Sequence, residues 1–143
     1  MRHVNVFLHT NIRGPQKKPG VGLYVLETET NQNAPASLQQ TMELTATENK
    51  ANLQILIKAL TRITQPCSLD IYTDSVYMAA GFDRMEKWEE SGWVTAKGTD
   101  VKNKEEWIQL KEMMEKHEYV FHVGEHHEYK NWMIREADKV QRR

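Results

Sequence analysis

The chain has 143 residues, 39% of them hydrophobic and 27% charged, which is the size and composition of one folded domain and argues against disorder. Because 19 Lys and Arg are balanced by 20 Asp and Glu, the formal net charge is −1, and any basic surface for nucleic acid must be local. The lone Cys67 excludes an internal disulfide and a cysteine zinc cluster. With no signal-peptide pattern and no run of 18 apolar residues, we expect a single cytoplasmic domain over residues 1–143 with no membrane partner.

The first third of the chain has a strand pattern. Valine and leucine alternate with polar residues over residues 3–9, which predicts a strand. After the turn-rich segment 14–20, residues 21–26 are β-prone, and residues 37–45 predict a weaker third strand. The short connections are typical of antiparallel neighbours.

After the third strand the hydrophobic spacing changes to that of an α-helix, with Thr47 as a candidate N-cap and Pro66 just past the end. Residues 69–73 form a short apolar strand, followed by Asp74 and a helix over residues 76–84. An aspartate at the C-terminal end of a strand lies where open α/β sheets build their sites.

The rest of the chain continues the alternation of helices and strands. A segment around Trp88 and Trp93 precedes a helix over residues 104–116, a strand over residues 119–123 and a final helix from about residue 130. Three strands followed by alternating helices and strands indicate an α/β fold, with a mixed sheet covered by helices on both faces.

Three segments carry a resemblance to a known family. They are Thr-Glu-Asn-Lys-Ala-Asn-Leu at 47–53, Tyr-Thr-Asp-Ser at 72–75, and the tryptophan-rich segment 88–107. In this order and spacing they resemble type 1 ribonuclease H over about residues 4–140. The resemblance implies an RNase H-like fold with a five-stranded mixed sheet in strand order 3-2-1-4-5, and ancestry in cutting the RNA strand of RNA/DNA hybrids.

The family it resembles holds two divalent ions, Mg or Mn, with four carboxylates. Ungapped alignment puts His9 at the first of these positions and Asn52 at the second, while Asp74 matches the third. Glu43 is a rival for the second position, but it would lengthen the interval to Asp74 by nine residues, so we interpret it as a strand residue.

The fourth carboxylate position has three alternatives. Alignment from His126, which resembles the mobile-loop histidine of the family, reaches Glu136. Alignment on Asn131 reaches Arg135, and a short insertion reaches Asp138. We favour Glu136 and keep the other two open.

These replacements predict a weak or absent metal pair. Two divalent ions bring four positive charges, whereas Asp74 and Glu136 supply two carboxylates at most, beside neutral Asn52 and a His9 that adds positive charge if protonated. Because imidazole suits softer ions such as zinc, His9 with Asp74 is a conceivable single-metal site.

Nucleic-acid binding could be retained where catalysis is lost, since proteins bind hybrids through phosphates and 2′-hydroxyls. The residues that match binding regions of the family are Asn49, Trp88, Lys97, Lys102 and Lys104. We therefore expect a protein that binds RNA/DNA hybrid or double-stranded nucleic acid with impaired catalysis. The alternatives are an active ribonuclease H with a rearranged metal site, and a module that binds a protein partner.

Overall fold

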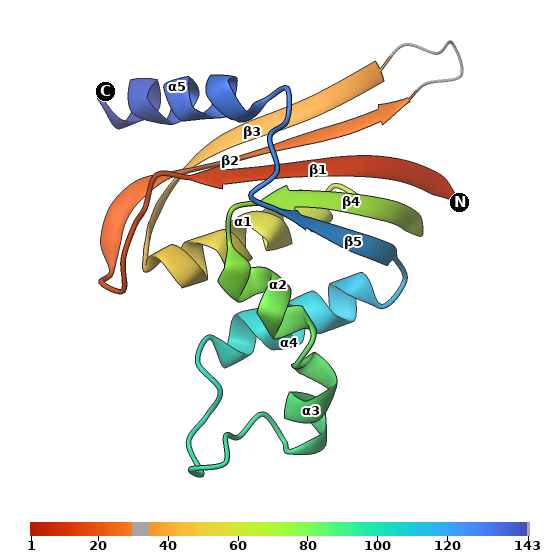
Figure 1. Ribbon diagram of the computed structural model, residues 1–143, viewed down its shortest axis with the longest axis vertical. Helices are drawn as coiled ribbons and strands as arrows, with labels where there is room; N and C mark the ends of the chain where they lie inside the picture. Colours follow the sequence, from red (N-terminus) through yellow and green to blue (C-terminus); the bar gives the residue numbers. More distant parts are fainter. Residues whose placement is uncertain (30–34, 143) are drawn as a thin grey trace.

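The computed structural model describes residues 1–29 and 35–142, which form one five-stranded sheet with helices on both faces (Figure 1). In chain order the elements are β1 (Arg2–Thr10), β2 (Lys18–Glu29), β3 (Pro35–Ala46), α1 (Glu48–Leu60), β4 (Cys67–Thr73), α2 (Val76–Phe82), α3 (Met85–Glu90), α4 (Lys104–Met114), β5 (Glu118–Val123) and α5 (Lys130–Gln141). The strand order is β3-β2-β1-β4-β5; the first three strands are antiparallel, and β1, β4 and β5 are parallel. This confirms the α/β fold and the expected order.

The strands β2 and β3 are longer than their sequence pattern predicts. Their antiparallel pairing runs without a break from Lys18 to Glu29 along β2, so this strand begins three residues before the expected Val21. Pairing with a neighbour supplies backbone hydrogen bonds that overcome the weak β-propensity of the proline and glycine there. Glu43 pairs with Val21 within β3, which confirms it as a strand residue.

Two helices on opposite faces enclose the sheet. On one face, α1 begins at the predicted cap, where the Thr47 hydroxyl accepts a hydrogen bond from the backbone N–H of Lys50 at 3.1 Å. Its buried leucines and isoleucines pack against β1 and β2, with α4 on its other side. On the other face, Met133 and Ala137 of α5 pack over β1 and β2. No helix in the described ranges is long and apolar enough to span a membrane.

The helix expected over residues 76–84 stops earlier, at Phe82, and α3 follows as a separate short helix. Close packing on α2 depends on Gly81, because a Cβ there would overlap the ring of Trp107 on α4, which is fully buried. The Tyr77 hydroxyl of α2 accepts hydrogen bonds from Trp107 Nε1 at 3.1 Å and from Asn103 Nδ2 at 3.0 Å. The segment from α3 to the start of α4 projects from this base (Figure 1), and we call residues 85–104 the protrusion.

Candidate functional site

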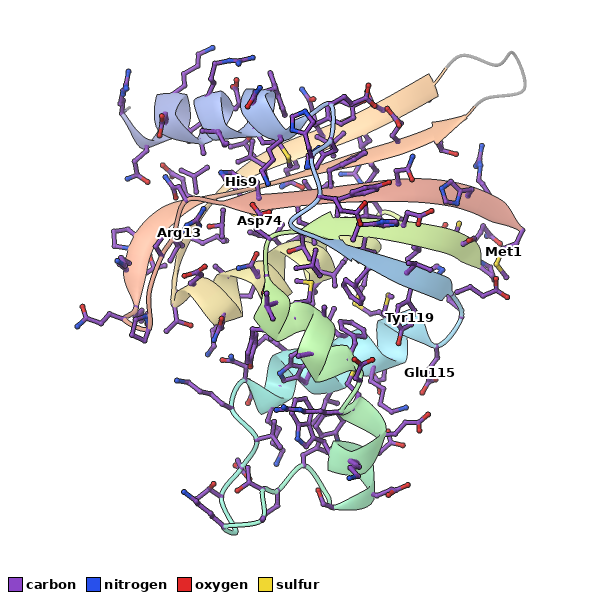
Figure 2. All side chains as sticks on the ribbon, viewed as in Figure 1. Met1, His9, Arg13, Asp74, Glu115 and Tyr119 are labelled. Atoms are coloured by element: carbon purple, nitrogen blue, oxygen red, sulfur yellow. The ribbon has the colours of Figure 1, made fainter. Side chains whose placement is uncertain are left out.

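The candidate site lies where the C-terminal ends of two parallel strands meet. His9 is the penultimate residue of β1, and Asp74 directly follows β4, its parallel neighbour. Asn52 comes from α1 and is 7% exposed. All three residues line one small cavity of about 70 Å³, as the resemblance implies. Figure 2 places His9, Asp74 and Arg13 together at this end of the sheet.

The carboxylate of Asp74 is bound by a lysine. Lys130, the first residue of α5, places its Nζ 2.8 Å from Asp74 Oδ1. Both residues line a second, smaller hollow that also includes His9, Glu125 and His127. The oxygen that would be the best metal ligand of the site is therefore paired with an ammonium group.

The imidazole of His9 is neutral at neutral pH. Burial lowers its pKa from 6.5 to about 4, and the positive charges of Arg13 and Lys130 act in the same direction, against the raising effect of Asp74. The expectation of a possible positive charge on His9 is therefore wrong near pH 7, because a buried ring beside two cations disfavours protonation. His9 can act there as a single hydrogen-bond donor and acceptor.

Two hydrogen bonds order the start of α1, and one of them joins it to the turn after β1. The Asn52 side-chain amide donates to the backbone oxygen of Glu48 at 2.9 Å, and Glu48 Oε1 accepts from the backbone N–H of Gly14 at 2.9 Å. Glu48 lines the same cavity as His9 and Asp74, although sequence reasoning passed over it. The signal was present, since Glu48 and Asn52 are four residues apart on one helix and share a face.

Arg13 is a second residue that sequence reasoning missed. Its Nη1 donates to the backbone oxygens of Thr10 and Ile12, which holds the guanidinium beside the cavity of His9 and Asp74. Its position follows from the turn after β1 and has no motif of its own. The site thus contains two cationic side chains, Arg13 and Lys130.

Helix geometry separates the three candidates for the fourth carboxylate. At 100° per residue, Asp138 lies about 80° around α5 from Lys130, whereas Glu136 lies about 120° away and Arg135 about 140°. Of the three, only Asp138 affects the pKa of His9, which it raises. None of the three lines either cavity of the site, and all three stay candidates for this position.

The two adjacent histidines of the loop before α5 differ in position. His126 is exposed and lines neither cavity of the site. His127 is half-buried, lines the smaller hollow, and packs its ring 4.6 Å from that of Phe7. Burial, followed by the charge of Lys130, lowers the pKa of His127. His127 is thus the histidine that lies at the site.

The residues expected to contact nucleic acid lie on α1 and the protrusion. Asn49, Lys97 and Lys102 are exposed. Lys104 is partly covered and lies 3.6 Å from Asp100, which offsets its charge. Trp88 is half-buried, and its ring packs against those of other tryptophans in the protrusion and on α4, so much of its surface belongs to the core.

Comparisons with known proteins agree with this architecture. The sequence model of a family described as RNase H matches residues 2–142. Ribonuclease HI of Haemophilus ducreyi is 29% identical over 143 residues, covering 98% of this chain and 90% of that protein. Ribonuclease H of Agrobacterium fabrum is 32% identical over 123 residues, covering 85% and 81%.

Two solved structures show the same fold. The crystal structure of LC9-RNase H1, described as a type 1 RNase H with the type 2 active-site motif, superposes with a TM-score of 0.77 at 19% identity, covering 97% of this chain and 72% of that one. The foamy viral protease-reverse transcriptase in complex with RNA/DNA hybrid gives a TM-score of 0.65 at 16% identity, covering 96% of this chain and 19% of that one.

Proposed function

Because this chain belongs to the RNase H family, we propose that it binds RNA/DNA hybrids or double-stranded nucleic acid, and that its metal-dependent cleavage of the RNA strand is lost or strongly impaired. The observation that carries the proposal is the ion pair between Lys130 and Asp74. An ammonium group already neutralises the one carboxylate of the site that matches the family pattern.

The donor set does not fit a pair of divalent ions. Magnesium and manganese prefer oxygen ligands, and two ions need several carboxylates to offset four positive charges. Here Asp74 is paired with Lys130, Glu48 accepts from a backbone N–H, and neutral His9 and Asn52 fill two carboxylate positions. Among the described residues no group of three or more metal-binding side chains converges, which also disfavours a zinc site at His9 and Asp74.

Nucleic-acid binding does not require these carboxylates. The foamy viral relative was solved with an RNA/DNA hybrid and, in another structure, with double-stranded DNA, and its fold matches nearly all of this chain. Exposed Lys97 and Lys102 give the protrusion cations that can meet phosphates. Acidic neighbours such as Asp100 dilute this charge, so we expect modest, salt-dependent affinity.

A cleavage assay tests the loss of activity. The purified protein is incubated with an end-labelled RNA/DNA hybrid over a range of Mg²⁺ and Mn²⁺ concentrations, and we expect no metal-dependent product. Metal-dependent cleavage that persists through repeated purification and disappears in the Asp74→Asn variant would overturn the proposal in favour of a rearranged active site.

Restoring the carboxylates tests the role of the lysine. We expect His9→Asp with Asn52→Glu to give at most weak cleavage, because Lys130 still neutralises Asp74, and we expect the further change Lys130→Met to increase it by up to about fivefold at low metal concentration. Lys139→Met in the same double variant is the matched control, since this lysine is exposed on α5. Equal cleavage by the double variant with and without Lys130→Met would show that Lys130 is no obstacle.

A binding assay tests the protrusion. Hybrid affinity is measured by fluorescence anisotropy at several salt concentrations for the wild type and for Lys97, Lys102 and Lys104 replaced together by alanine. Each phosphate contact that is lost should reduce the slope of log affinity against log salt by about 0.9. The control removes three positive charges outside the protrusion: Lys58, Arg62 and Lys116. Absence of binding even at low salt would favour the protein-interaction alternative.

A further inference from the structure

A further cavity lies at the end of the sheet opposite the candidate site. The paired strands β2 and β3 have 12 residues each, about 40 Å when extended, whereas the 13 residues of α1 span only about 20 Å. The helix ends at Leu60, and the chain then turns toward β4. Part of the sheet face therefore extends past the helix that covers it.

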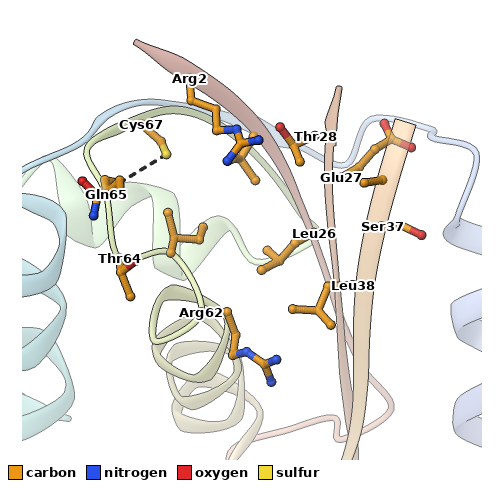
Figure 3. Close-up of a pocket in the computed structure, with 13 residues that line it drawn as sticks. Arg2, Leu26, Glu27, Thr28, Ser37, Leu38, Arg62, Thr64, Gln65 and Cys67 are labelled. Atoms are coloured by element: carbon orange, nitrogen blue, oxygen red, sulfur yellow. Dashed lines mark hydrogen bonds between the residues drawn. The ribbon is translucent and has the colours of Figure 1, made fainter. Parts of the chain in front are cut away.

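This uncovered face forms a pocket of about 260 Å³. Its floor is apolar and comes from both the sheet and the segment after α1, with side chains of Val4, Leu26, Leu38, Ile63 and Cys67. In Figure 3, Leu26 and Leu38 reach into this space from the strands, and Cys67 is held at its edge by a hydrogen bond from Sγ to the backbone oxygen of Gln65 at 3.2 Å. Leu38 remains 40% exposed, so the pocket is open to solvent.

The charges around the pocket are positive. Arg2 and Arg62 both line it and lie on opposite sides of the opening in Figure 3, and neither forms an ion pair with any described residue. The one acidic lining residue, Glu27, directs its carboxylate elsewhere, because its oxygens accept hydrogen bonds from Tyr129 and Asn5. An apolar floor with two free guanidinium groups is complementary to an amphipathic anion.

We propose that this pocket binds a small amphipathic carboxylate, with its hydrocarbon part on the apolar floor and its carboxylate at Arg62 or Arg2. The volume corresponds to about nine water molecules, and thus to a ligand of about ten non-hydrogen atoms, such as a medium-chain fatty acid. Guanidinium groups suit carboxylates because they offer paired N–H donors. The site does not depend on nucleic-acid binding, since it lies at the start of β1, and His9 lies at the other end of that strand.

Octanoate is the probe for the test. Titration of the ¹⁵N-labelled full chain should give amide chemical-shift changes that cluster at Leu26, Leu38, Ile63 and Cys67 and leave Asp74 unchanged. We expect a dissociation constant of about 1 mM, as is usual for a ligand of this size. Shifts scattered over the surface, or none up to 10 mM, would overturn the proposal.

Charge variants test how the ligand is recognised. Arg62→Met and Arg2→Met should each weaken octanoate binding by about two- to fivefold, because exposed ion pairs are worth little, while Arg84→Met, on an exposed arginine outside the pocket, should change nothing. Leu38→Trp should block the pocket without removing either charge. Octylamine should bind more weakly than octanoate.

The remaining outcomes also decide the question. Equal binding of octylamine and octanoate would show that the arginines do not select the ligand and would refute the proposal. Sedimentation that reveals a dimer dissociated by Leu38→Trp would do the same, because the apolar face would then be covered by a second copy of the chain.

Discussion

Acid should destabilise this protein through His9 in a defined pH window. The pKa of His9 is lowered from 6.5 to about 4 in the folded protein, first by burial and then by Arg13. Below pH 6.5 the unfolded chain therefore binds a proton at this residue, whereas the folded chain does not. The free energy of unfolding should fall as the pH falls from about 6.5 to 4, and this contribution should level off below pH 4.

The size of the effect follows from the shift. A difference of about 2.5 pH units at 1.36 kcal/mol per unit corresponds to about 3 kcal/mol. That is a large part of the 5–15 kcal/mol that typically stabilises a domain. At pH 7, by contrast, about one His9 ring in a thousand is protonated in the folded protein.

Urea unfolding at pH 7.5, 6.5, 5.5 and 4.5 measures this contribution. The wild type should lose about 2.5 kcal/mol more than His9→Asn across this range, because asparagine cannot titrate and other acid-sensitive groups are common to both proteins. An NMR titration of the His9 ring gives the folded pKa directly. A measured value at or above 6.5, or parallel stability curves for the two proteins, would refute the reasoning.

Three further outcomes are expected. Lys130→Met should lower the Mn²⁺ dissociation constant at Asp74 by up to about fivefold, because a partly exposed ion pair is worth about that much. Paramagnetic broadening of NMR signals near Asp74 measures this, and unchanged broadening would show that the ion pair does not oppose metal binding. Gly81→Ala should lower the free energy of unfolding by about 1–3 kcal/mol, because the added methyl group overlaps a buried tryptophan ring, and an unchanged urea midpoint would contradict this. Hydrogen bonds to Asp70, and then to a second carboxylate, raise the pKa of His122. Its contribution to the free energy of unfolding is therefore complete below pH 6.5 and is lost as the pH rises through the raised pKa. His122→Gln should abolish this loss of stability in urea titrations, and a loss that persists in the variant would come from another group.

Much of the fold was predictable because hydrophobic spacing reports local structure. The change of period at Thr47 and the apolar run before Asp74 depend on neighbouring residues, so the order of elements could be inferred. The lengths of β2 and β3 could not, because they depend on pairing between strands far apart in sequence. The break between α2 and α3 was missed because neither proline nor glycine stands at Asp83 or Arg84, between the two helices.

The residues of the candidate site also divide into those that the sequence could predict and those that it could not. His9, Asn52 and Asp74 could be located because each lies in a motif with fixed spacing, and the structure brings them to one cavity. Lys130 could not, because its contact with Asp74 joins residues 56 positions apart and arises only when α5 packs on the sheet.

The two hydrogen bonds accepted by Tyr77 have a consequence for how the protrusion engages a duplex. They fasten Asn103, at the base of the protrusion, and the ring nitrogen of Trp107 on α4 to the Tyr77 hydroxyl of α2. A loop that is already held in place before it binds its ligand loses little conformational entropy on association, so more of the free energy of each phosphate contact contributes to the affinity. Tyr77→Phe should therefore weaken hybrid binding although Tyr77 need not touch the duplex, with faster amide hydrogen exchange along residues 94–103 as its signature.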